Sequence, residues 1–380
     1  MKLHSNIFLL FSAVVFALLN ISNQNEEKIP KTNSPDTTSI TISVVGDLMC
    51  HSPQYEYAKV ALDSFDFTPA FNEIKKYFGS SDFVFGNLET VTAGKAKTYS
   101  GYPFFNSPKD YITSLKKIGF NFLFTSNNHC LDRGETGVVR TLEELKKNEI
   151  NSTGTFASQN ERDSITVLSA NGISFAVVSY TYGTNGNLVP KGKHYLVNLI
   201  SDSLVSSDIQ KARSCNVDFV LVYFHFGEEY QREPNTYQKA VVQNAIDAGA
   251  DVILASHPHV LQPIEFFKSK GKLDSGFVAY SLGNFISNQR WRYSDAGVIL
   301  QFKIKMNRVS HDLKLENIAF VPTWVFKGKI DKKNQFVILP SSKSKNDFPF
   351  LSNQDYYKMN QSFQDSKQIL QKYSPSLQIN

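Results

Sequence analysis

The sequence predicts an α/β fold, because apolar segments typical of buried strands alternate with amphipathic segments typical of helices. The strand segments are rich in β-branched and aromatic residues, and polar or turn-forming residues bound them. They span 40–49, 83–85, 122–125, 173–180, 219–224, 252–255, 277–280 and 298–304. The helical segments span 108–118, 135–147, 202–215 and 236–248. Because no short period repeats along the chain, a solenoid or a propeller is not expected.

The N-terminal residues are typical of an export signal. An apolar run at 7–19 follows Lys2 and His4, and no acidic residue interrupts it. The run is short for a membrane span, so residues 1–22 are predicted to be a cleaved signal peptide, with an N-terminal anchor as the alternative. Asn, Lys, Ser, Thr and Pro dominate 23–38, which predicts a flexible linker. We therefore expect an exported protein, either periplasmic or otherwise extracytoplasmic, or held at the membrane through its N-terminus.

The rest of the chain is predicted to contain one main domain and a short extension. Residues 39–322 carry the alternation of strands and helices, whereas 323–380 are rich in Lys, Ser, Asn and Asp. This extension is predicted to be a peripheral C-terminal segment with a helix near 354–373. The net charge of +5 is spread along the chain and forms no dense basic block, so no nucleic-acid partner is expected.

Three cysteines are present, Cys50, Cys130 and Cys215, and an odd number cannot form a complete set of disulfides. Buried thiols are the first interpretation. Cys50 and Cys130 both lie beside motifs that we assign to one site, so a bridge between them is the alternative in an oxidising compartment.

Polar clusters follow directly after five of the predicted strands. They are Gly46-Asp47, Gly86-Asn87-Leu88-Glu89, Asn127-Asn128-His129, His225-Phe226-Gly227-Glu228 and His257-Pro258-His259. Ligands of open α/β sheets bind beyond the carboxyl ends of the strands, so these clusters are expected to form one site. A single His or Asn at a strand end is more often structural, and it is the joint occurrence of five clusters that favours a functional site.

The side chains of these clusters predict a site for two divalent metal ions. Carboxylates, an amide oxygen and imidazoles, without thiolate, suit Mn, Zn or Fe(II). The predicted ligands are Asp47, Glu89, Asn128, His225, His257 and His259. Two ions need one carboxylate that bridges them, and Glu89 is the candidate. Because His129 follows the ligand Asn128, its ring is expected to face the substrate and to act as general acid.

Together these motifs resemble the CapA family, also called PgsA, of poly-γ-glutamate capsule synthesis proteins, in the calcineurin-like metallophosphatase superfamily. The resemblance covers roughly Ile40 to Phe285. It rests on VVGDLM at 44–49, FGNLET at 85–90, TSNNHCLDRGETG at 125–137, FHFGEEY at 224–230, ASHPHVLQP at 255–263 and AYSLGNFI at 279–286. It implies a four-layer α/β/β/α sandwich, formed by the metallophosphatase domain 39–322, with the metal site at one edge.

The resemblance also implies roles for the predicted ligands. Asp47 resembles the aspartate of the first superfamily motif, and Glu89 falls where the bridging carboxylate is expected. Asn128 and His129 resemble a pair in which Asn binds the second metal and His contacts the leaving group or phosphate. The remaining ligand positions match the isolated histidine and the two histidines of the final motif, namely His225, His257 and His259.

Two motifs depart from the superfamily pattern. Met49 stands where the first motif, Asp-x-His, has its histidine, so one ion lacks a ligand. His51, two residues further on, either replaces that ligand or faces solvent. Asn87 stands in the motif where the superfamily has the first aspartate of Gly-Asp-x-x-Asp, and it is a further candidate for the site.

Five other residues are candidates for binding metal or substrate or for supporting the ligands. Arg133 and Glu135 either bind an anionic group or cap and charge the helix that follows. Glu228 and Glu229 are expected to orient the histidine that begins their motif. Asn284 either lines the cleft or shapes a turn.

The resemblance implies an exported metal-dependent hydrolase or transferase. It would make, release or attach an anionic extracellular polymer such as poly-γ-glutamate, with a membrane synthase complex as a further partner. Two alternatives stay open, because a fold hosts many functions. One is a non-catalytic metal- or polymer-binding component of a membrane polymer synthase, which the missing histidine at Met49 motivates. The other is an extracytoplasmic phosphodiesterase.

Overall fold

Two β-sheets pack face to face. The computed structural model describes residues 36–380, and the predicted signal peptide or anchor and most of the predicted linker lie outside the described residues. The larger sheet has the strand order β16 (Lys333–Pro340), β15 (Leu313–Ile330), β14 (Ala296–Asn307), β1 (Thr37–Leu48), β4 (Phe83–Leu88), β5 (Phe122–Phe124) and β6 (Asn151–Thr153), with β13 (Asn284–Ile286) beside β1 and β17 (Gln378–Ile379) beside β15. The smaller sheet has the order β11 (Ile264–Phe267), β12 (Gly276–Ala279), β10 (Val252–Ser256), β9 (Phe219–His225), β8 (Ile173–Thr181) and β7 (Thr166–Ala170). A separate hairpin pairs β2 (Lys59–Ala61) with β3 (Ser64–Phe65).

Alternate side chains along the strands build the core between the sheets. Val298 and Leu300 of β14 belong to the central hydrophobic cluster, whereas Ile299 belongs to a cluster on the outer face of the larger sheet. In the smaller sheet, Leu221 and Tyr223 of β9 belong to the central cluster, and the alternate residues of the same strand face outward. This alternation follows from the two-residue period of a strand, and it gives each sheet two apolar faces to cover.

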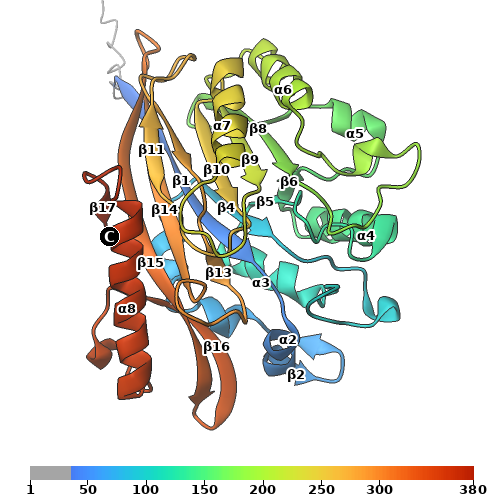
Figure 1. The fold of residues 1–380 in the computed structure, drawn as a ribbon, viewed down its shortest axis with the longest axis vertical. Helices are drawn as coiled ribbons and strands as arrows, with labels where there is room; N and C mark the ends of the chain where they lie inside the picture. The colour runs from blue at the N-terminus through green and yellow to red at the C-terminus, as the bar shows by residue number, and fades with distance from the viewer. Residues whose placement is uncertain (1–35) are drawn as a thin grey trace, which may run out of the picture. The chain divides into compact units, whose positions relative to one another are not determined.

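Helices cover the outer face of each sheet. On the larger sheet these are α3 (Asp110–Ile118) and the short helices Thr68–Phe71 and Lys75–Phe78. On the smaller sheet they are α6 (Asp202–Ser214) and α7 (Thr236–Ala248), as Figure 1 shows. The order of helices, sheet, sheet and helices confirms the predicted four-layer α/β/β/α sandwich. The remaining helices before the C-terminal segment are α2 (Ser52–Ala58), α4 (Gly134–Lys147) and α5 (Gln159–Asp163), with short 3-10 helices at Lys95–Lys97 and His194–Leu196.

Each of the eight predicted strands and five predicted helices overlaps an observed element. The ends differ by a few residues, and the strands that were not predicted are β2, β3, β6, β7, β11, β13, β15, β16 and β17. Among residues 36–380 there is no helix with both the length and the apolar character needed to span a membrane.

The C-terminal segment differs from the prediction. The boundary expected after residue 322 falls inside β15, and residues 37–380 form one compact unit. β16 pairs with β15, and α8 (Asn353–Leu370) packs against both strands through a cluster that includes Trp324, Leu339 and Met359. The segment is therefore built into the larger sheet. Its composition is misleading because the polar turn between β15 and β16 and the exposed face of α8 carry the lysines and asparagines.

The strands that precede the polar clusters run parallel within each sheet. β1, β4 and β5 are parallel neighbours, as are β8, β9 and β10. Asp47 of β1 is in register with Asn87 of β4, and His225 of β9 is in register with Ser256 of β10. The carboxyl ends of these strands therefore deliver the predicted clusters to a common edge of the sandwich.

All three cysteines are unpaired. Cys50 and Cys130 are buried, whereas Cys215 is exposed. Burial raises the pKa of the Cys50 and Cys130 thiols to about 12, so both are neutral at physiological pH. The alternative of a bridge between Cys50 and Cys130 is not realised in this structure.

Candidate metal centre

Two carboxylates and one imidazole form the first part of the candidate centre. Asp47, Glu89 and His259 each offer one ligand atom, and these three atoms lie within 4.8 Å of one another. Nδ1 of His259 lies 3.2 Å from Oδ2 of Asp47, and Nε2 lies 3.8 Å from Oε1 of Glu89. All three side chains are buried. Buried charges are expensive unless they are paired or bind a metal, so this arrangement calls for a cation.

The second part of the centre contains the predicted amide ligand and two further histidines. Nε2 of His225 lies 2.9 Å from Oδ1 of Asn128, and the same nitrogen lies 3.8 Å from Oε1 of Glu89. The rings of His225 and His257 have centroids 4.9 Å apart. Glu89 thus lies between the two parts, as expected of a bridging carboxylate. The structure brings all six predicted ligands together.

Several buried atoms of these ligands have no hydrogen-bond partner. They are Oδ2 of Asp47, Oε1 of Glu89 and Nδ1 of His257. Nδ1 of His259 is near Asp47 but is directed at Oδ1 of Asn284, 3.0 Å away. Buried polar atoms are normally paired, and a divalent cation would satisfy these atoms. The residues present therefore fit the metal ions that the sequence predicts.

The electrostatics of the ligands favour a bound cation. Burial, together with the neighbouring Asp47 carboxylate, raises the pKa of Glu89 well above its ordinary value. Burial lowers the pKa of His225 well below its ordinary value and that of His257 to about 3. Two carboxylates crowded together gain most from a positive ion, and neutral imidazole is the form that binds metal.

Two amides hold the ligands in position. Nδ2 of Asn87 donates to Oδ1 of Asp47 over 2.8 Å and lies 3.2 Å from Nδ1 of His225, while its Oδ1 accepts from Asn127. Asn284 accepts from His259 and donates to the carbonyl oxygen of Ser294. Asn87 therefore lies in the middle of the ligands, and Asn284 supports His259. The sequence motifs had made both amides candidates for the site.

His129 lies beside the ligands with its two ring nitrogens in different surroundings. Nδ1 is 2.8 Å from Oδ2 of Asp132, and the same carboxylate oxygen accepts from the backbone N–H of Phe105. Nε2 is 3.5 Å from Nδ2 of Asn185, whose Oδ1 accepts from Asn128. Asp132 and Asn185 were missed by sequence reasoning. For Asp132 there was a signal, because it follows His129 by three residues in the same motif.

Of four other predicted residues, three have structural partners instead. Arg133 donates to the carbonyl oxygen of Phe104 and so holds the 100–104 loop, and Glu135 pairs with Lys193 at 2.6 Å. The His51 ring lies near the Gln54 side chain and the backbone N–H of Asn288.

Glu228, the fourth, is outside both groups of clustered metal-ligating side chains found in the described part of the chain. Met49, where the superfamily has a histidine, has its sulfur 3.5 Å from the hydroxyl of Ser287, and so does not replace the missing ligand. His51 is also outside both groups of clustered ligand atoms found in the described part of the chain, and its Nδ1 lies near Gln54 and Asn288.

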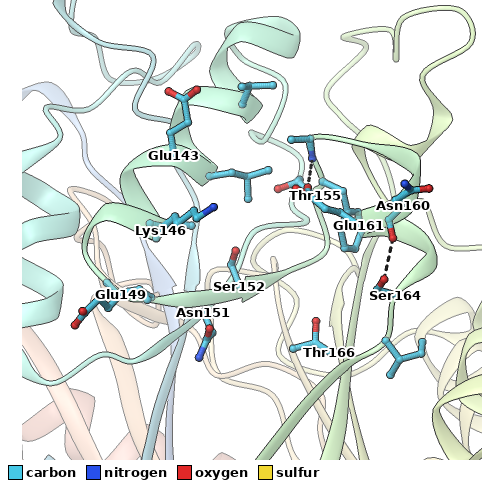
Figure 2. A pocket seen from close by; sticks show the side chains of 17 residues that line it. Glu143, Lys146, Glu149, Asn151, Ser152, Thr155, Asn160, Glu161, Ser164 and Thr166 are labelled. Carbon is cyan, nitrogen blue, oxygen red and sulfur yellow. Dashed lines mark hydrogen bonds between the residues drawn. The ribbon is translucent and has the colours of Figure 1, made fainter. Parts of the chain in front are cut away.

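A wide groove lies elsewhere on the molecule, between α4, β6, α5 and β7 (Figure 2). Its volume is about 1060 Å³, and its lining includes Glu143, Lys146, Asn151 and Glu161. None of the predicted ligands lines it. β6 and β7 are the outermost strands of their sheets, so the groove marks the open side of the sandwich and not the metal centre.

Comparison with known proteins decides the family. The family model described as "Bacterial capsule synthesis protein PGA_cap" matches residues 41–289, which is more than half of the chain. The chain belongs to this family. The family resemblance predicted from the motifs is thereby confirmed, and the matched range contains every predicted ligand of this PGA_cap protein.

Curated relatives agree with the family assignment. The PGA_cap protein is 28% identical over 293 residues to "Capsule biosynthesis protein CapA" of Bacillus anthracis, which covers 75% of this chain and 68% of the relative. It is 27% identical over 309 residues to "PGA biosynthesis protein CapA" of Bacillus subtilis (strain 168), covering 80% and 78%.

Solved structures resemble this one in fold alone. A phosphatase from Mycoplasma pneumoniae has a TM-score of 0.44 and 14% identity, covering 75% of this chain and 94% of that chain. The calcineurin-like phosphoesterase YfkN from Bacillus subtilis has a TM-score of 0.40 and 12% identity, covering 87% and 97%.

Exposed aromatic side chains surround the metal centre of the PGA_cap protein. The Tyr182 ring lies 4.5 Å from that of His257, and the Tyr230 ring lies 6.1 Å from that of His259. Trp291 packs edge-on against Tyr230, and Tyr102 lies near His129. We call these four residues, Tyr102, Tyr182, Tyr230 and Trp291, the aromatic rim. Their side chains are between 40% and 73% exposed, so they are free to contact a ligand at the centre.

Proposed function

We propose that this protein is an exported metal-dependent hydrolase or transferase that acts on the backbone of an anionic extracellular polymer of the poly-γ-glutamate type. The observation that carries the proposal is the meeting of Asp47, Glu89, Asn128, His225, His257 and His259, with buried atoms that lack partners. Divalent ions held by these residues would polarise the bond to be broken and lower the pKa of an attacking water.

His129 would supply the proton that the leaving group needs. Its Nδ1 hydrogen is held by the Asp132 carboxylate at 2.8 Å, so Nε2 is the nitrogen that exchanges a proton on the substrate side. The backbone N–H of Phe105 fixes the Asp132 carboxylate, so the pair is oriented before substrate binds.

The aromatic rim supports an extended substrate. Rings on four different loops are exposed around one centre, and each presents a flat face that can stack on planar amide groups of a polymer backbone. A chain of γ-glutamyl units offers such amides at regular intervals, while its carboxylates are attracted to the metal ions. The names of the two curated relatives, which refer to capsule and PGA biosynthesis, support the same class of substrate. The apolar N-terminal run at 7–19 supports export.

The test is turnover by the purified full chain. The chain would be incubated with Mn²⁺ or Zn²⁺ and either poly-γ-glutamate or a small phosphodiester, and polymer length and phosphate-ester cleavage would be measured. We expect shortening or transfer of the polymer, and His129→Asn should slow it by about 10²–10⁴-fold. His311→Asn is the matched control, because His311 is exposed in the β14–β15 turn and Asn accepts its left-handed backbone.

Each other outcome would replace this proposal with a different function. Cleavage of the phosphodiester without change in the polymer would identify an extracytoplasmic phosphodiesterase. Binding of metal and polymer without turnover would identify a non-catalytic component of a membrane polymer synthase.

A further inference from the structure

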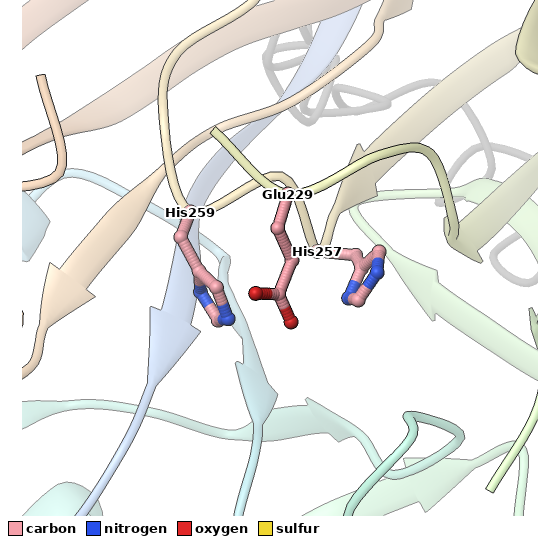
Figure 3. Close-up of side chains that lie close together, drawn as sticks. All are labelled: Glu229, His257 and His259. Atoms are coloured by element: carbon pink, nitrogen blue, oxygen red, sulfur yellow. The ribbon is translucent and has the colours of Figure 1, made fainter. Parts of the chain in front are cut away.

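The carboxylate of Glu229 lies between the imidazoles of His257 and His259, as Figure 3 shows. Each of the three side chains offers one ligand atom, and these atoms lie within 4.8 Å of one another. Glu229 was expected from the sequence to orient His225. The structure instead directs it at the two histidines of the following loop.

The backbone holds Glu229 in this position. The N–H of Phe226 donates to the carbonyl oxygen of Ser256 over 3.0 Å, and the N–H of Tyr230 donates to that of Pro258 over 2.7 Å. These two bonds tie the loop on both sides of Glu229 to the loop that carries the histidines. Gly227 permits the turn between them, because its φ is +114° and a side chain there would collide with Gln238 at 2.8 Å.

The histidine loop adopts backbone conformations that non-glycine residues rarely take. The φ angles are +109° at His257 and +57° at His259, and Tyr230 in the neighbouring loop of Glu229 has a φ of +66°. Each such residue costs on the order of 1–3 kcal/mol and persists where its surroundings fix it, commonly at functional sites. The fold thus stabilises a strained loop that turns both imidazoles toward one carboxylate.

No hydrogen bond joins Glu229, His257 and His259 to one another among the described residues, and Nδ1 of His257 has no partner. Metal–oxygen and metal–nitrogen bonds of about 2.0–2.2 Å hold the ligand atoms of one ion roughly 3–4 Å apart. The three ligand atoms lie within 4.8 Å of one another, which is compatible with this arrangement, and the exposed Glu229 side chain can rotate to fit an ion.

Charge favours the same interpretation. Without Glu229 the centre offers the two carboxylates of Asp47 and Glu89 against the four positive charges of two divalent ions. The other predicted ligands are neutral amide or imidazole groups. The carboxylate of Glu229, at the exposed side of the centre, is a third negative charge and brings the charge of the ligands closer to that of the ions.

We propose that Glu229 is a metal ligand that acts with His257 and His259. It supplies a ligand in place of the histidine that the first motif lacks at Met49. This inference rests on the metal centre of the proposed function, and it goes beyond that function by naming a ligand outside the predicted set.

The test is metal binding by the full chain, which needs no substrate. Mn²⁺ binding to the wild type, Glu229→Gln and Glu233→Gln would be measured by titration calorimetry, with electron paramagnetic resonance to count bound ions. Glu233→Gln is the matched control. It also removes one carboxylate charge, but four residues further along the chain, where Glu233 pairs with Lys372. We expect Glu229→Gln to weaken the binding of one of the two ions by at least about 10-fold and to leave the affinity for the other unchanged. Glu233→Gln should bind both ions as the wild type does.

The outcomes separate this inference from the proposed function. Binding of both ions by Glu229→Gln with wild-type affinity overturns the ligand assignment and leaves the proposed function standing. A wild type that binds no metal overturns both. Melting temperatures in EDTA should be equal for all three proteins, because Glu229 is exposed, and a lower value for Glu229→Gln alone would make its role structural.

Discussion

Asp132 is the residue on which the proposed proton transfer by His129 depends. One carboxylate oxygen accepts from both the His129 ring and the Phe105 backbone, and the other has no hydrogen-bond partner. A carboxylate held in this way keeps the imidazole in one tautomer and one orientation. Because the hydrogen bonds of the Asp132 side chain go to His129 and Phe105 and not to the predicted ligands, the effect of Asp132 on proton transfer should be separable from metal binding.

Asp132→Asn should lower kcat by about 10–100-fold and leave KM and bound metal unchanged. The amide keeps the size of the side chain but replaces the carboxylate that holds Nδ1 of His129. The measurements are steady-state kinetics on the polymer and metal analysis of the same preparation. If the variant loses metal in proportion to activity, Asp132 acts on the ligands and not on His129.

Asp295 gives the molecule a pH dependence of its own, apart from the metal centre. It is buried, and Nε1 of Trp324 donates to it over 2.8 Å. Burial raises the pKa of its carboxyl from 3.8 to about 6. The folded state therefore holds the proton more tightly than the unfolded chain, and stability falls as the pH rises from about 4 to about 6.

Asp295→Asn should remove this dependence, since an amide accepts the Trp324 hydrogen bond without titrating. The free energy of unfolding of the wild type relative to the variant should fall by about 2–3 kcal/mol between about pH 4 and pH 7, and stay level above. Urea unfolding across this range measures the difference. A difference that is constant with pH, or that grows toward neutral pH, would contradict the assigned shift.

At the scale of elements, the end of β1 and the loop before β13 must approach closely to form the centre. The N–H of Asp47 donates to the carbonyl oxygen of Gly283 over 2.9 Å. A side chain at Gly46 would lie 2.0 Å from the same oxygen, so only glycine allows the contact. The position of the ligand Asp47 thus depends on the absence of a side chain one residue earlier.

Gly46→Ala should destabilise the protein by at least about 1–3 kcal/mol, because backbone must move to admit the methyl group. It should also weaken metal binding by displacing Asp47. Gly183→Ala is the matched control, as a side chain there meets nothing within 4 Å. Urea unfolding and metal titration of both variants test this, and equal behaviour of the two would show that β1 tolerates the shift.

The elements and the ligands differ in how far the sequence predicts them. Asp47, Glu89, Asn128, His225, His257 and His259 lie within the polar clusters just after strands, so strand prediction and parallel order are enough to bring them together. That reasoning uses only the direction of the strands, which apolar patterns reveal.

Contacts between loops are beyond such reasoning. Glu229 reaches its position through the bond between Tyr230 and Pro258, and Asn185 through a left-handed turn at φ +51°. Neither bond nor turn leaves a pattern in the local sequence. The same holds for β16, which is stabilised by α8 and β15 and not by its own composition.

At the scale of the whole molecule, the metal centre joins the two sheets. The carboxyl ends of strands in the larger sheet carry Asp47, Glu89 and Asn128, whereas those in the smaller sheet carry the three histidine ligands. Ions bound between them would link layers that otherwise meet through apolar packing. Metal binding should therefore stabilise the entire described domain and not a single loop.

Mn²⁺ at about 100 times its Kd should raise the free energy of unfolding by about 2.7 kcal/mol for each site filled. At one fixed Mn²⁺ concentration the rise should be larger at about pH 8 than at about pH 5.5, because ions must displace protons from their ligands and the Kd is therefore higher at the lower pH. Burial and Asp47 raise the pKa of Glu89, so the metal-free protein keeps this proton at low pH and loses stability as the pH rises through the raised pKa. Bound metal should cancel that loss.

Calorimetric melting with Mn²⁺ or EDTA at both pH values measures the effect, and His257→Ala, which lacks a ligand, should show a smaller shift. A shift that shrinks toward pH 8, or is equal in His257→Ala, would mean that the stabilising ions bind elsewhere.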